Sequence, residues 1–176
     1  MKHLSHLFFI AFLCMLTACT TINSSRQVTQ TSANQPWGIV AFNNNTETPQ
    51  AGNRATSITA NVLRAKGVYN LSTFQPYGDC SQLVSCPSTS IPLRSVLAWA
   101  QKRNLCYVMT GSVNEWQYKV GLDGEPVAAV ALQLYDVNSG RVIWSAVGSK
   151  IGNGRSGLGN VGQSLIDNML KSLAVR

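Results

Sequence analysis

Histidine and acidic residues are scarce in this sequence, and their scarcity excludes several classes of function. Of 176 residues, two are histidines, His3 and His6, and both lie in the apolar N-terminal segment. The remainder of the chain therefore lacks the commonest general base and the commonest metal ligand. Seven Asp and Glu residues stand against fourteen Lys and Arg. This inventory argues against an enzyme and predicts neither a metal site nor a cofactor.

The charged residues also lack the spacing that catalysis or nucleic-acid binding needs. Only Asp123 and Glu125 are acids close together in the sequence. A glycosidase holds two carboxylates about 5 to 10 Å apart in a cleft. These two instead point the same way along an extended segment, which suits a charged rim. The basic residues are scattered without interleaved aromatics, so they fit anionic lipid headgroups better than nucleic acid.

The longest apolar run is N-terminal and has the form of a signal peptide. Lys2 precedes residues 4–16, which are almost continuously apolar. That run has the length of a signal h-region and is too short to span a bilayer. It ends in Leu-Thr-Ala-Cys, the lipobox pattern, at Cys19. We therefore expect residues 1–18 to be cleaved and Cys19 to be lipid-modified; a signal peptide that merely contains a cysteine is the alternative.

The residue after the lipidated cysteine indicates whether the anchor lies in the inner or the outer membrane. Aspartate at this position is the usual signal for inner-membrane retention, whereas this chain has Thr20. We expect a lipid anchor in the outer membrane, with the protein on the periplasmic face. Several acyl chains, at about 0.8 kcal/mol per buried methylene, anchor a protein firmly.

Three further cysteines remain in the mature chain. Cys80 and Cys86 bracket a short polar loop in a compartment where disulfides persist, and we interpret them as a disulfide pair. A structural metal site is the rival interpretation. Cys106 alone could not complete a four-ligand zinc shell without histidine. It lies in an apolar run and is expected to be a buried free thiol.

The rest of the chain predicts a tether followed by one α/β domain. Residues 19–35 are rich in Ser, Thr, Asn and Gln and are expected to form the lipid anchor and a flexible tether, and residues 36–176 the domain. Apolar periodicity predicts a mixed sheet covered by helices, in the order βαβαβββα. The expected strands are 38–42, 68–74, 105–118, 126–137 and 141–151, and the expected helices are 55–66, 92–100 and 158–173.

A glycine-rich run follows the last predicted strand. Residues 152–157 match the G-x-G-x-x-G pattern of nucleotide-binding loops. That fingerprint requires the first strand of a βαβ unit and an acidic residue about twenty positions later. Neither requirement is met here, so we interpret the run as a loop.

Three stretches carry a family resemblance. They are FNNNTETPQAGNRA at 42–55, TGSVNEWQYKVGLDGEP at 110–126 and SGRVIWSA at 139–146. Together, and behind a lipobox, they resemble PelC, the lipoprotein family of the Pel exopolysaccharide export system. The resemblance implies a fold like the N-terminal domain of TolB and a non-catalytic role in biofilm formation.

The resemblance also implies partners and site residues. Proteins similar to PelC form a homo-oligomeric ring, a dodecamer, beneath the outer membrane at the entrance of the porin-like PelB. The resemblance implies that an acidic funnel in the ring gathers a cationic exopolysaccharide. Asp123 falls where the family motif places a funnel carboxylate, with Glu125 beside it. Aspartate is also a good turn former before glycine, so Asp123 could simply shape the turn.

The membrane side of the ring is expected at Lys150, Ile151 and Arg155. An aromatic residue of the family, near the end of the last strand, enters the membrane, and residues 151–155 contain no aromatic here. Ile151 is a weak substitute. The competing function is a periplasmic adaptor or regulatory lipoprotein that binds an envelope enzyme, which would not need acids around a lumen.

Overall fold

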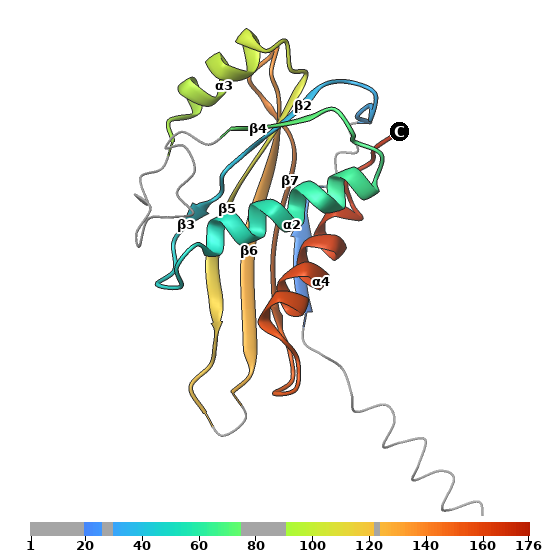
Figure 1. Cartoon of the computed structure of the whole chain (residues 1–176). Coiled ribbons are helices and arrows are strands. Elements are labelled where there is room, and N and C mark those ends of the chain that lie inside the picture. Colours follow the sequence, from blue (N-terminus) through green and yellow to red (C-terminus); the bar gives the residue numbers. More distant parts are fainter. Residues whose placement is uncertain (1–19, 26–29, 75–90, 122–123) are drawn as a thin grey trace, which may run out of the picture.

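A mixed seven-stranded sheet organises the protein (Figure 1). The computed structural model describes residues 20–25, 30–74, 91–121 and 124–176. The strand order is β1-β7-β6-β5-β2-β4, and the short β3 pairs with β5 off this path. The strands are β1 (Thr20–Ser24), β2 (Trp37–Val40), β3 (Asn43–Asn44), β4 (Leu71–Phe74), β5 (Tyr107–Tyr118), β6 (Pro126–Asp136) and β7 (Val142–Ile151).

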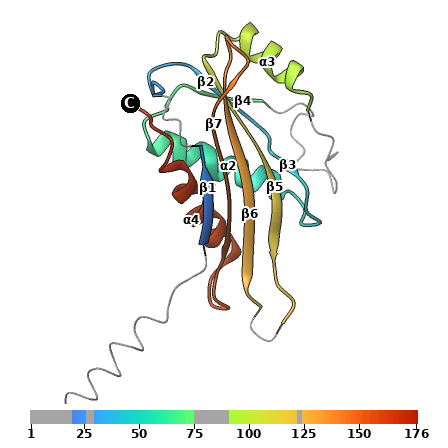
Figure 2. The same ribbon diagram turned by 180° about the vertical axis from the view of Figure 1, so that it is seen from behind.

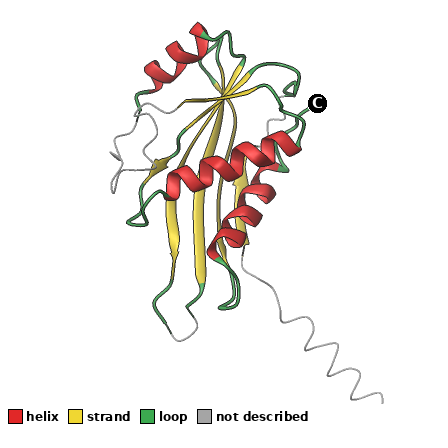
Figure 3. Cartoon of the chain, viewed as in Figure 1, coloured by secondary structure: helices red, strands yellow, loops and turns green. Residues whose placement is uncertain are grey.

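Two helices cover one face of this sheet, and a third covers part of the other (Figure 3). They are α2 (Ala51–Ala65), α4 (Leu158–Leu170) and α3 (Leu93–Lys102). Because successive side chains of a strand point to opposite faces, one strand serves both layers. Met109 of β5 packs in the main core with α2 and α4, whereas its neighbour Val108 packs with α3.

The main core is dense because large aromatic side chains meet small helical ones. Trp116 is almost fully buried beneath α4. A Cβ added to Gly162 would overlap its indole ring, so only glycine lets the helix approach this closely. Trp144 is equally buried, and its Nε1–H donates to Ser172 Oγ over 3.1 Å. The helix α2 approaches in the same manner, since a Cβ on Gly52 would strike the Phe42 carbonyl oxygen.

The predicted α/β fold and its element order are confirmed. The apolar spacing located α2, α3 and α4, and the glycine run at 152–157 is the loop between β7 and α4. The structure adds β3, formed by two asparagines in a segment expected to be a loop. No helix among the described residues is long and apolar enough to cross a membrane.

The expected flexible tether at residues 19–35 differs from the structure. Thr20–Ser24 form β1, which pairs antiparallel with β7 at the edge of the sheet. Further on, the N–H of Thr31 donates to the Ala174 carbonyl over 3.0 Å, and that of Ala33 to the Arg176 carbonyl over 2.7 Å. Polar composition misled the prediction because an edge strand needs only backbone hydrogen bonds and one half-buried side chain, here Ile22.

Candidate functional site

The β5–β6 hairpin carries the predicted funnel acids and extends beyond the helices (Figure 1). The backbone N–H of Lys119 donates to the Glu125 carbonyl over 2.8 Å and extends the strand pairing into the hairpin. Glu125 is exposed, and Val120 is fully exposed. Asp123 lies outside the described residues. The described part of the hairpin thus presents the Glu125 carboxylate to solvent.

The hairpin is secured to the body of the domain on one side by α4. The Leu158 N–H at the start of α4 donates to the Tyr118 hydroxyl over 3.1 Å. Gly157 offers no capping side chain, so the tyrosine supplies an acceptor for one of the free amide groups of the helix start.

The loop before α2 also holds β5. Asn44 Oδ1 accepts hydrogen bonds from the N–H and the hydroxyl of Thr46, over 3.1 and 2.8 Å. The Thr48 hydroxyl then donates to the Trp116 carbonyl over 2.5 Å. The Thr-Glu-Thr-Pro stretch therefore fixes β5 just before the hairpin. The sequence singled out this stretch but gave no sign of its contact with β5.

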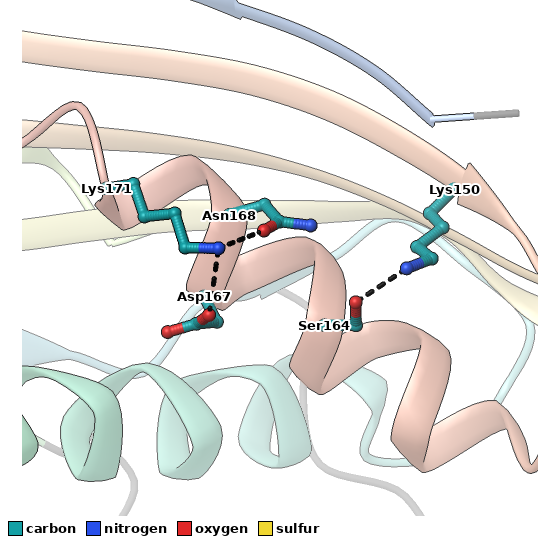
Figure 4. A network of polar contacts seen from close by, with 5 residues as sticks. All are labelled: Lys150, Ser164, Asp167, Asn168 and Lys171. Atoms are coloured by element: carbon teal, nitrogen blue, oxygen red, sulfur yellow. Dashed lines mark hydrogen bonds and ion pairs between the residues drawn. The ribbon is translucent and has the colours of Figure 1, made fainter. Parts of the chain in front are cut away.

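The predicted membrane-facing residues lie at the end of β7 and in the loop that follows. The Lys150 ammonium donates to Ser164 Oγ of α4 over 2.6 Å, so it is directed toward the helix (Figure 4). Ile151 is half-buried and pairs with Val127. Arg155 is exposed in the loop. The structure thus brings Lys150 and Ile151 together at one sheet end but engages the lysine with α4.

The chain start lies at the same end of the sheet. Thr20 is the partner of Lys150 in the β1–β7 pairing. The predicted lipidation residue, Cys19, lies outside the described residues, but it is bonded to Thr20. The β5–β6 hairpin lies at this end too, since Val127 pairs with Ile151.

Of the three remaining cysteines, the structure describes one, Cys106. Cys80 and Cys86 lie outside the described residues. Cys106 is a free thiol that is half-buried, rather than fully buried as expected, and its Sγ donates to Gln35 Oε1 over 3.2 Å. Across residues 20–25, 30–74, 91–121 and 124–176, no three His, Cys, Asp or Glu side chains gather as a metal site would require.

Ion pairing contributes little to this arrangement. In the part of the chain that the structure describes, one ion pair is present, between Lys171 Nζ and Asp167 Oδ2 at 3.6 Å (Figure 4). Both side chains are more than half exposed, so the pair adds little stability.

Comparison with solved structures places the fold in a class and then in a family. The fold is shared with the lipoprotein GNA1162 from Neisseria meningitidis, at a TM-score of 0.55 and 14% identity over 78% of this chain and 99% of that one. The protein is thus a single mixed α/β domain of a kind found in bacterial lipoproteins.

Closer relatives identify the family. The PelC dodecamer from Paraburkholderia phytofirmans matches with a TM-score of 0.76 and 37% identity, over 90% of this chain and 99% of that chain. A PelC variant from the same organism, also a dodecamer, matches at 0.75 and 36%, over 90% of this chain and 100% of that one. The chain belongs to the PelC family. No protein-family model and no curated protein matches it.

Proposed function

We propose that this protein forms a ring beneath the outer membrane and guides a cationic exopolysaccharide into an export porin, without catalysing a reaction. The observation that carries the proposal is its 37% identity, over 90% of the chain, to a PelC that is a dodecamer. A shared sequence of this extent supports shared self-association. The scarcity of acids and histidines in the mature chain agrees with a role that involves no catalysis.

The acids of the β5–β6 hairpin are the proposed polymer-facing groups. Two unit charges 4 Å apart in water attract by only about 1 kcal/mol, so one exposed carboxylate holds a passing cation weakly. Identical carboxylates arranged around a pore focus the field and raise the local cation concentration. We assign Asp123 and Glu125 to this rim.

The membrane-facing end is assigned from the position of β1. A lipid on Cys19 would be one residue from the Thr20–Lys150 pair. The anchor would therefore hold this sheet end close to the bilayer, without a flexible linker between them. Arg155 is the better candidate for headgroup contact because it is exposed, whereas the Lys150 ammonium donates to Ser164. Ile151 adds an apolar contact at the same end.

Charge reversal tests the polymer-facing assignment. We expect Asp123→Lys to reduce secreted polymer strongly while the mature protein still assembles. Glu47→Lys is the matched control, because Glu47 is an exposed acid on the loop before α2. Undiminished secretion by Asp123→Lys would remove Asp123 from the rim. A monomeric wild type that binds an envelope enzyme would favour the adaptor function instead.

A further inference from the structure

Among the described residues, no helix covers strands β1 and β7 and the adjoining parts of β6 and β5 on one face of the sheet. Figure 2 shows strands β1, β7, β6 and β5 from behind, with helix α3 near one end only. The α3 contacts on this face involve Val40, Val108 and Val137, toward the β2 side. The uncovered part, here called the open face, has at its centre Asn23, Ala129, Ala131, Gln133, Ser145 and Val147.

The open face has an unusual composition for a surface in contact with water. None of its six central residues is charged, and Val147 is 50% exposed. Solvent-facing protein surfaces usually carry charges on about a quarter to a third of their residues. This chain has such charges on and next to its helices, where Arg54 and Arg64 of α2 and Lys171 just after α4 are exposed. Depletion of charge with small side chains is the composition of an interface centre.

We propose that the open face is a surface on which a second copy of this chain docks. The inference rests on the proposed ring, which needs two different complementary surfaces on each subunit. The open face supplies one of these two surfaces, on the side of the sheet opposite to α2 and α4 (Figures 1 and 2).

The size of the open face fits a stable contact. The strand β1 contributes five residues. With about eight from each of β5, β6 and β7, a strand spacing of about 4.8 Å and roughly 3.4 Å per residue give roughly 470 Å² in projection. A corrugated surface has more accessible area than its projection, and a stable complex buries about 800 Å² on each partner. The open face can therefore supply most of one interface.

Other occupants fit the open face less well. A bilayer surface would select Lys, Arg and aromatic side chains, and the six central residues include none. A cationic polymer would select several carboxylates, whereas one, that of Glu115, lies beside the central residues, where Glu115 pairs with Ala129. A second copy requires only shape and the absence of unpaired charge.

Charge insertion tests the proposal on the mature, lipidated protein in detergent, with mass measured by light scattering. We expect Val147→Arg to weaken assembly by about 100-fold or more, because the interface would bury an unpaired charge. Val120→Arg is the matched control, since Val120 is fully exposed on the hairpin, away from the open face. It should assemble as wild type. Ala131→Arg, beside Val147 on β6, should repeat the loss.

A labelling measurement covers the case in which an arginine variant does not fold. Val147→Cys and Val120→Cys are compared for their rate of reaction with a polar maleimide, read at the level of peptides. We expect position 147 to react at least tenfold more slowly in the assembled protein. Equal rates, or Val147→Arg and Ala131→Arg that keep the wild-type mass, would overturn the open face as the contact. A monomeric wild type would instead overturn the proposed ring.

Discussion

The two faces of the same sheet differ in what determines their side chains. On the covered face, Met109, Leu132 and Trp116 are buried against α2 and α4. On the open face the alternate positions, such as Ala131 and Gln133, are small or polar and belong to neither hydrophobic core cluster. The covered face is therefore specified by folding of the single chain. We propose that the side chains of the open face are instead determined by contact with a second subunit.

The largest loss of stability is expected from a substitution on the covered face of β6, which we compare with its neighbour on the open face. Leu132→Ala removes a fully buried side chain from the covered face and should lower the free energy of unfolding by about 3 kcal/mol. Gln133→Ala, one residue further and exposed, should change it by less than about 0.5 kcal/mol. Urea unfolding of the dissociated protein measures both. Equal losses in the free energy of unfolding would show that burial does not distinguish the two faces.

Glycine substitutions on α4 sharpen the same comparison. Gly162→Ala places a methyl group in the Trp116 ring and should destabilise the protein by about 2 kcal/mol. Gly159→Ala lies on the same helix with nothing within 4 Å of an added Cβ. That variant should be stabilised by about 0.5 to 1 kcal/mol, because alanine favours helix. Thermal unfolding compares the two, and a stabilising Gly162→Ala would contradict the close approach of α4.

The smallest effect concerns the contact between the loop before α2 and the backbone of β5. Thr48→Val removes the hydrogen bond to the Trp116 carbonyl and should cost about 1 kcal/mol. Thr48→Ser keeps the hydroxyl and should recover most of that loss. Chemical denaturation of both variants checks the prediction. If the valine variant is as stable as wild type, the loop before α2 does not secure the hairpin strand.

Much of the fold could be predicted because apolar periodicity encodes burial. The spacing of Ala55, Thr59 and Leu63 located α2, and these residues are buried in the structure. The strand β1 could not be predicted in this manner, since Thr20–Ser24 form it through backbone pairing with β7. Backbone hydrogen bonds leave no trace in side-chain hydropathy.

The candidate site was predictable only through its resemblance to the PelC family. The hairpin acids and the loop at 42–55 gave a family and a proposed role for Asp123. The Lys150–Ser164 contact was not foreseeable, because it depends on how α4 lies across the sheet. The open face escaped notice because Ala, Ser and Gln within strands do not stand out until the layers are known.

The most direct test of the account is the assembly state of the wild-type mature protein. Light scattering combined with negative-stain imaging, on the lipidated protein in detergent, measures both mass and shape. The account predicts closed rings with a central hole and a mass twelve times that of the protomer. A monomer that persists at high concentration would contradict it.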